Sequence, residues 1–288
     1  EVPVEADHFH ALMVLNGVNA TERLDVDEDQ TEDPDRHVCS MKAGHGGTLD
    51  PMATGILPIA LGEATKTTAY AMAGAKTYRF AVAWGESRDT DDDEGVVAGT
   101  SDRRPTEAEI GAALGSFIGE IDQTPPAYAA IKVDGQRAYK LARQGNPATM
   151  TPRRVRIDRL DLLSLADADH AVFEMDCGKG VYVRSLARDL AAVLGAEGHV
   201  SALRRERVGP FHTENAVTLD FLEDLVHRGA ASEGLLPVAT ALDDIPELAV
   251  TDPDLSLDEG VIGYWNPQSS RYARDQLRGL KERFEFDS

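Results

Sequence analysis

The chain has 288 residues, with 50 acidic and 29 basic side chains and a formal net charge of −21. The length favours one large or two ordinary domains, and a hydrophobic fraction of 42% excludes global disorder. The two cysteines, Cys39 and Cys177, exclude a disulfide framework and a four-cysteine zinc site. The acidic balance argues at first against a nucleic-acid partner, because phosphate binders usually carry a positive field.

The sequence predicts no membrane segment and fits a reducing, cytoplasmic setting. The stretch from Glu1 to His10 has no basic region followed by an apolar one. Apolar runs such as Ile56 to Leu61 are too short to span a bilayer.

An acidic run and a glycine-rich loop come first in chain order. Residues Glu22 to Arg36 hold eight acids against two arginines, which predicts a solvated or poorly ordered segment. In the loop from Gly44 to Gly55, Asp50 is followed by a proline that restricts the backbone. A carboxylate on a stiff turn is a catalytic candidate, and a local cap of the turn is the alternative. The loop lacks the Gly-Lys-Ser/Thr end of a phosphate cradle.

The next predicted elements are a strand, a turn and a helix. Alternation over Thr77 to Trp84 predicts a half-buried strand. The acidic run from Asp89 to Glu94 lacks the spacing of a calcium loop, so it predicts a solvated turn. A capping box at Thr106 and Glu109 predicts a helix that ends near Ile118.

The sign of the charge reverses farther along the chain. Lys132 to Arg159 is net +6, and Lys179 to Arg207 is net +3, counting acids against lysines and arginines in each range. Basic stretches within an acidic chain are candidates for contact with a polyanion.

The second half of the chain predicts two strands and a helix around Arg184. Ala171 to Cys177 and Val181 to Val183 read as strands, and Ser185 as the cap of the following helix. The expected apolar face of that helix consists of Leu186, Leu190, Val193 and Leu194. Arg184 would then lie at a strand end. Strands mixed with helices favour an α+β fold.

Several motifs together resemble one family. The segment from Lys42 to Lys66, KAGHGGTLDPMATGILPIALGEATK, is similar to the signature of the TruB family of pseudouridine synthases. Further family motifs follow in the expected order: KTYR at 76–79, QTPPAYAAIK at 123–132, GVYVRSL at 180–186 and SALRR at 201–205. The resemblance implies the pseudouridine synthase fold, with a mixed central sheet and flanking helices.

The resemblance also implies roles for single residues. Asp50 would be the catalytic carboxylate that attacks the target uridine, and Arg184 would pair with it. Tyr78 would stack on the flipped base and is the family's candidate for removing the C5 proton. His45 would enter the space that the base leaves in the RNA stack. The remaining predicted supports of substrate or loop are Tyr182, Lys132, Arg204 and Arg205. The resemblance implies no metal and no cofactor.

The sequence AIKVDGQRAY at 130–139 resembles the corresponding segment of the stand-alone bacterial enzymes of the family. We therefore predict a tRNA pseudouridine synthase, a monomer that isomerises the TΨC-loop uridine of tRNA, position 55. One alternative is a guide-RNA-dependent synthase of the H/ACA type. Another is a catalytically impaired module that binds or folds tRNA.

The resemblance divides the chain into three parts. Residues 1–41 are an atypical N-terminal segment, with a first strand at Ala11 to Asn16 and the acidic loop in place of the family's Lys-Pro motif. Residues 42–242 are the catalytic domain. Residues 243–288 are a short extension, a remnant or replacement of the family's PUA region, so that a PUA-like domain is absent or truncated. An amphipathic stretch lies around 272–284.

The basic residues are 22 arginines against 7 lysines, and Asp dominates the acids. This imbalance is typical of salt-adapted proteins and favours a halophilic source.

Overall fold

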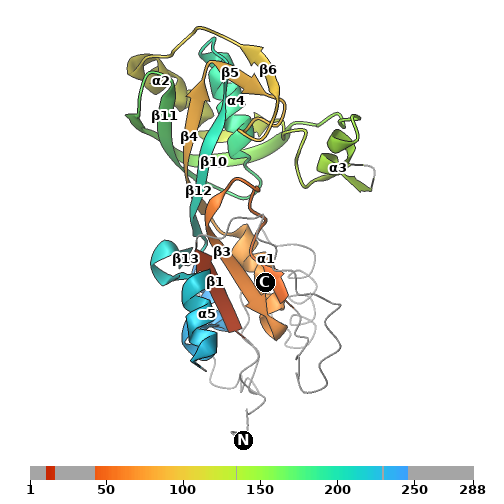
Figure 1. Ribbon diagram of the computed structural model, residues 1–288, viewed down its shortest axis with the longest axis vertical. Coiled ribbons are helices and arrows are strands. Elements are labelled where there is room, and N and C mark those ends of the chain that lie inside the picture. Colours follow the sequence, from red (N-terminus) through yellow and green to blue (C-terminus); the bar gives the residue numbers. More distant parts are fainter. Residues whose placement is uncertain (1–10, 17–42, 134, 229, 246–288) are drawn as a thin grey trace, which may run out of the picture. The chain divides into compact units, whose positions relative to one another are not determined.

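The structure is a computed structural model that describes residues 11–16, 43–133, 135–228 and 230–245 (Figure 1). The strands are β1 (Ala11–Asn16), β2 (Ala43–His45), β3 (Thr54–Leu61), β4 (Lys76–Trp84), β5 (Glu86–Arg88), β6 (Val97–Thr100), β7 (Gly119–Gln123), β8 (Lys132–Val133), β9 (Gln136–Arg137), β10 (Arg153–Leu165), β11 (His170–Cys177), β12 (Gly198–Val208), β13 (Phe211–His212), β14 (Val217–Thr218) and β15 (Leu236–Pro237). The α-helices are α1 (Thr68–Ala73), α2 (Glu107–Leu114), α3 (Ala138–Arg143), α4 (Val183–Val193) and α5 (Leu219–His227). The 3-10 helices are η2 (Gly62–Lys66), η3 (Gly115–Phe117), η4 (Thr213–Asn215), η5 (Ala231–Gly234) and η6 (Val238–Leu242).

Most strands join one mixed sheet, as the sequence predicts for an α+β fold. Its order is β14-β1-β3-β12-β4-β11-β10-β7, and β2, β13 and β15 pair beside this path. Strand β12 runs parallel to β3 and antiparallel to β4, so it joins segments that are far apart in the sequence. The chain divides into two units, Glu1–Ala241 and Leu242–Ser288, and this sheet lies in the first.

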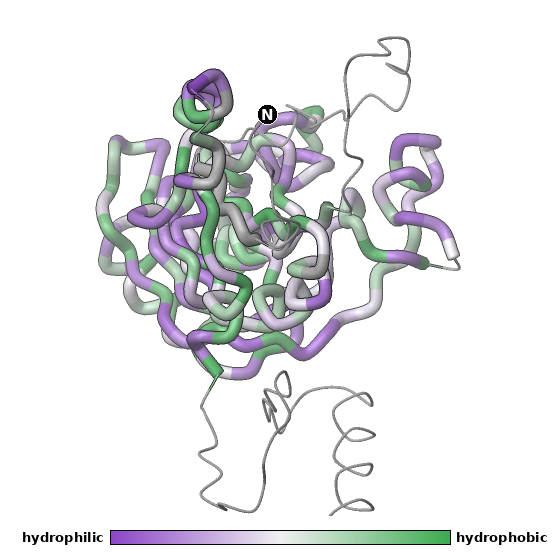
Figure 2. Tube along the Cα trace, turned by 90° about the horizontal axis from the view of Figure 1, so that it is seen from below, coloured by the Kyte–Doolittle hydropathy of each residue, from purple (hydrophilic) through white to green (hydrophobic). Residues whose placement is uncertain are grey.

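The main core lies where α2 and α4 cover one side of β4, β10, β11 and β12. Phe80 on β4 and Phe173 on β11 are register partners whose rings stack with centroids 5.3 Å apart. Fully buried apolar side chains alternate along β11 with half-buried ones, which are polar except for Val172, so the opposite face is mostly hydrophilic. Figure 2 shows hydrophobic and hydrophilic residues interspersed along the described trace.

The structure confirms the predicted strands at β1, β4 and β11 and the capping box of α2. The Thr106 hydroxyl accepts from the Glu109 backbone N–H, and the Glu109 carboxylate accepts from the Thr106 N–H. The helix ends at Leu114, and a 3-10 turn, η3, continues it to Phe117.

The prediction around Arg184 is wrong in its details. No strand forms at 181–183: α4 begins at Val183, with Tyr182 rather than Ser185 as its N-cap. Ser185 lies inside the helix, where its hydroxyl donates to the Thr124 carbonyl. Val193, expected on the apolar face, is 61% exposed.

Helix α3 and the hairpin β8–β9 form an excursion that stands off from the sheet in both views (Figures 1 and 2). The acidic run at 22–36 and the amphipathic stretch at 272–284 lie outside the described residues. Within the described ranges, no helix is both long enough and apolar enough to cross a membrane.

Candidate active site

The Asp50 loop connects β2 to β3 and is fixed by its own turn and by the core. The Ala53 N–H donates to the Asp50 carbonyl over 2.9 Å, which closes a turn with Pro51 in the position that favours proline. Leu49 and Ala53, on either side of this turn, are buried members of the main core. Asp50 itself keeps 28% of its side chain exposed. The loop therefore presents one immobilised carboxylate to solvent.

Arg184 pairs with Asp50 as predicted. The Arg184 Nε and Nη2 atoms each donate to a different oxygen of Asp50, both over 2.8 Å. The Arg184 side chain is only 4% exposed, and its remaining donors reach the carbonyls of Thr90 and Tyr128. A bidentate pair of this kind fixes both distance and orientation.

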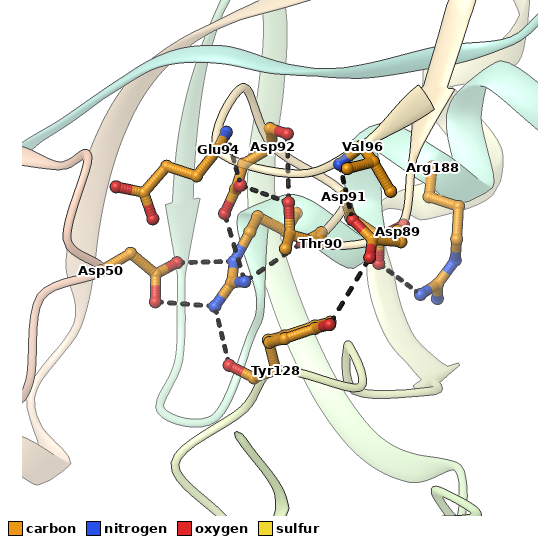
Figure 3. A network of polar contacts seen from close by, with 10 residues as sticks. Asp50, Asp89, Thr90, Asp91, Asp92, Glu94, Val96, Tyr128 and Arg188 are labelled. Carbon is orange, nitrogen blue, oxygen red and sulfur yellow. Dashed lines mark hydrogen bonds and ion pairs between the residues drawn. The ribbon is translucent and has the colours of Figure 1, made fainter. Parts of the chain in front are cut away.

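Asp92 is a member of the site that the sequence analysis missed. Its Oδ2 lies 3.2 Å from Arg184 Nη1, and its side chain is 2% exposed, so the prediction of a solvated turn is wrong here. The Thr90 hydroxyl and the Glu94 backbone N–H donate to Asp92 Oδ1 over 2.5 and 3.1 Å. Figure 3 shows Asp50 and Asp92 coming from different segments to this centre. One buried guanidinium is thus shared by two carboxylates.

The turn that carries Asp92 is itself anchored. Asp91 has a positive φ of 62°, and its carboxylate contacts Arg188 of α4 over 2.9 Å. The Asp93 backbone N–H donates to the Val200 carbonyl, and the Asp93 carboxylate contacts His199 over 2.8 Å. A lone acidic run in a sequence carries no sign of these partners.

Two tyrosines border the carboxylate. Burial raises the pKa of Tyr78 to about 12, although the charge of Arg205 opposes that rise. Burial, followed by the charge of Asp50, also raises the pKa of Tyr182. Both phenols therefore stay protonated at neutral pH and lie close enough to Asp50 for its charge to raise their pKa values.

The backbone of Tyr182 is held by a residue that sequence reasoning did not single out. The Gln123 side chain accepts from the Tyr182 N–H over 2.8 Å and donates to its carbonyl over 3.1 Å. Gln123 is 2% exposed. Its place in the motif QTPPAYAAIK was the available signal.

His45 and Lys132 are both exposed. His45 ends β2, and its Nδ1 accepts from the Gly47 N–H over 3.3 Å, which leaves Nε2 as the ring donor. Lys132 lies on β8, in the excursion that stands off from the sheet.

Arg204 and Arg205 have opposite environments although they are neighbours on β12. Arg204 is 36% exposed and contacts Glu206 over 2.9 Å. Arg205 is 1% exposed and donates to backbone carbonyls of the Asp50 loop. Arg205 therefore contacts the Asp50 loop, whereas Arg204 is partly open to solvent.

The basic stretch at 132–159 separates into two groups. Lys132, Arg137, Lys140 and Arg143 are exposed, and none of them forms an ion pair within the described ranges. Arg154, Arg156 and Arg159 are matched by acids of β7, β10 and β11. Arg153 on β10 is likewise exposed and forms no ion pair within the described ranges, so it joins the first group, which keeps its positive charge available to a ligand.

Within the part of the chain that the structure describes, no group of three or more His, Cys, Asp or Glu side chains is placed to hold a metal ion.

Three family models match successive parts of the chain. Residues 36–183 match the TruB family pseudouridylate synthase N-terminal domain. Residues 184–243 match the tRNA pseudouridylate synthase B C-terminal domain. Residues 246–288, which lie outside the described ranges, match the UvrA DNA-binding domain. The likeness to the synthase models thus stops at residue 243, and the remainder resembles a different family.

Curated proteins show the same likeness. A tRNA pseudouridine synthase B of Caulobacter sp. (strain K31) is 57% identical over 215 residues, which are 75% of this chain and 69% of the relative. The Bradyrhizobium diazoefficiens protein of the same name is 57% identical over 218 residues, which are 74% of this chain and 63% of the relative.

Solved structures include proteins of H/ACA particles. One, an H/ACA RNP bound to a substrate RNA containing 2′-deoxyuridine, is 25% identical with a TM-score of 0.53, and the match covers 71% of this chain and 53% of that one. A Cbf5-Nop10-Gar1 complex has a TM-score of 0.59 at 23% identity over 85% of this chain and 65% of that one, which shows a shared fold.

Proposed function

The chain belongs to the TruB family of pseudouridylate synthases, and we propose that it isomerises the TΨC-loop uridine of tRNA, position 55, to pseudouridine. In this reaction the N1–C1′ bond breaks and a C5–C1′ bond forms, while C5 loses a proton and N1 gains one. No oxidant, reductant or cofactor is needed for that balance.

The observation that carries the proposal is the partly exposed carboxylate of Asp50 on its buried partner Arg184. The two-point contact fixes the position of the carboxylate and leaves the Asp50 side chain 28% exposed, which suits a nucleophile that must meet a substrate. A target base has to leave its stack to reach such a group. Tyr78 then offers an aromatic surface on which the extruded base could stack, an interaction worth about 1 to 3 kcal/mol.

The cations of the excursion support a tRNA substrate despite the net charge. Lys132, Arg137, Lys140 and Arg143 are exposed around β8, β9 and α3. At physiological salt the Debye length is about 8 Å, so acids farther away than this act weakly on an RNA bound there. We expect a cytoplasmic monomer to bind the TΨC stem-loop in this way.

The direct test is an assay on an unmodified tRNA transcript, with chemical mapping of pseudouridine. Asp50→Asn should abolish product while tRNA binding persists, because the amide removes the nucleophile and keeps the size. Asp122→Asn is the matched control, since Asp122 is 65% exposed and lies 3.8 Å from its partner Arg154. A wild-type protein that yields no product at the TΨC loop at any salt concentration contradicts the proposal.

The same assay separates the two alternatives. A guide-dependent enzyme would form product only after a guide RNA and partner proteins are added. A binding or folding module would retain tRNA equally in the wild type and in Asp50→Asn, with product in neither. The 51–58% identical curated relatives, all named tRNA pseudouridine synthase B, favour the stand-alone enzyme.

A further inference from the structure

Arg205 lies at the junction between the strands that carry the two sides of the site. On β12 it is the register partner of Gly55 on β3, which follows the Asp50 turn. It is also the register partner of Tyr78 on the other neighbour, β4. The backbones approach so closely that a Cβ on Gly55 would lie 2.2 Å from the Arg205 carbonyl oxygen. Arg205 therefore contacts both the loop and the aromatic strand.

The Arg205 guanidinium reaches the loop on both sides of Asp50. Its Nη2 donates to the Gly47 carbonyl over 3.0 Å and its Nη1 to the Thr48 carbonyl over 3.3 Å, before the catalytic position. Its Nε donates to the Ile56 carbonyl over 3.1 Å, after it. Three donors in one rigid plane thus hold both ends of the loop.

The charge of Arg205 has no acidic partner in the described ranges. Its side chain is 1% exposed, and its contacts with the loop are with neutral carbonyls. A buried cation without a counter-ion is costly, so a role in packing alone would be served better by an apolar residue. Burial raises the pKa of the neighbouring Tyr78, and the charge and hydrogen bond of Arg205 oppose this rise, which indicates that the guanidinium also faces the phenol.

We propose that Arg205 is a positioning residue that holds the Asp50 loop and Tyr78 in one fixed arrangement. The inference rests on the proposed function only for its kinetic consequence. The effect on the loop itself can be measured without any activity.

The experiment compares Arg205→Lys with Arg79→Lys in the full-length chain. Lysine keeps the charge but has one ammonium group, which cannot reach three separated carbonyls. Arg79 is the matched control, because it neighbours Tyr78 on β4, is 53% exposed and pairs with Glu174. Three quantities are measured for each variant: amide hydrogen exchange by peptide, the dissociation constant for tRNA, and the single-turnover rate at saturating protein.

In Arg205→Lys, amides of residues 46–56 should exchange several-fold faster while those of β10 and β11 stay protected. The single-turnover rate should fall roughly 100-fold, as expected for a misplaced catalytic group, and the dissociation constant should stay within about twofold. Arg79→Lys should match the wild type in all three.

Some results would overturn the inference. Unchanged exchange in the loop would show that Arg205 does not hold it, whether or not the wild type is active. A dissociation constant that rises as much as the rate falls would indicate substrate binding instead. If Arg205→Lys does not fold, Arg205→Gln is measured in the same way. If neither variant folds, Arg205 stabilises the whole domain, which contradicts a role confined to the loop and Tyr78. If the wild type forms no product but the loop of Arg205→Lys exchanges faster, the result contradicts the proposed function and supports the positioning role of Arg205.

Discussion

At the scale of single residues, the centre of the site is a guanidinium with two acidic neighbours. Arg184 donates two hydrogen bonds to Asp50 and lies 3.2 Å from Asp92, while both Arg184 and Asp92 are almost fully buried. Asp92 cannot reach solvent or substrate easily, so its effect on the reaction passes through Arg184. Asp92 contacts Nη1 of Arg184, while Nε and Nη2 of the same guanidinium donate to Asp50.

We therefore expect Asp92→Asn to weaken both stability and activity. Loss of a charged contact in a buried site should lower the free energy of unfolding by about 1.5–3 kcal/mol. Pseudouridine formation should slow because Arg184 is held less firmly. Urea unfolding and the tRNA assay check this, with Glu94→Gln as the control on the same turn, since that side chain is exposed. Equal behaviour of the two variants would contradict the role given to Asp92.

At the scale of elements, the parallel contact between β3 and β12 explains why a glycine follows the Asp50 turn. Gly55 has φ of +99°, and the Arg205 backbone fills the space where a side chain would be. Gly145 also has a positive φ, +75°, but nothing lies within 4 Å of its Cβ position. Alanine substitutions at the two glycines therefore distinguish the free-energy cost of the positive φ from the cost of the close contact with the Arg205 backbone.

Gly145→Ala should destabilise the protein by about 1–2 kcal/mol, the ordinary cost of an L-residue in this conformation. Gly55→Ala should cost clearly more, because β3 and β12 must also move apart. Unfolding in urea measures both. If the free energy of unfolding falls equally in both variants, the close approach of β3 and β12 adds no cost to the substitution at Gly55.

At the scale of the whole molecule, the β8–β9 hairpin and α3 carry four exposed cations that form no ion pair within the described ranges. Lys132→Gln should weaken tRNA binding similarly for all sequences and lower the slope of log K against log salt by about 0.7 to 0.9. Arg154→Gln removes the same charge from an arginine already near Glu120 and Asp122 and should leave the slope unchanged. Filter binding over a range of KCl concentrations makes the comparison, and equal slopes for both variants would contradict it.

The net charge of −21 gives a second prediction at this scale. Self-repulsion of the acids weakens as the Debye length falls from about 10 Å at 0.1 M salt to about 3 Å at 1 M. The thermal unfolding temperature should therefore rise with KCl, as expected for a salt-adapted protein. A steady decline of stability and activity with added KCl would rule out the halophilic hypothesis.

The sequence by itself determined the elements and the motif residues whose signals are local. Alternation predicted β4, the spacing of Thr106 and Glu109 predicted the start of α2, and Pro51 predicted the turn that holds Asp50. These features depend on neighbours within a few residues, which the sequence displays directly.

The tertiary structure alone decided which of several identical side chains belong to the site. Nothing in the run at 89–94 distinguishes Asp92 from its neighbours until α4 brings Arg184 against it. Arg204 and Arg205 are equivalent in the sequence, and only their places on β12 expose one and bury the other. The reason is physical: burial and pairing depend on strand register and on contacts between segments 92 or more residues apart, which no local pattern encodes.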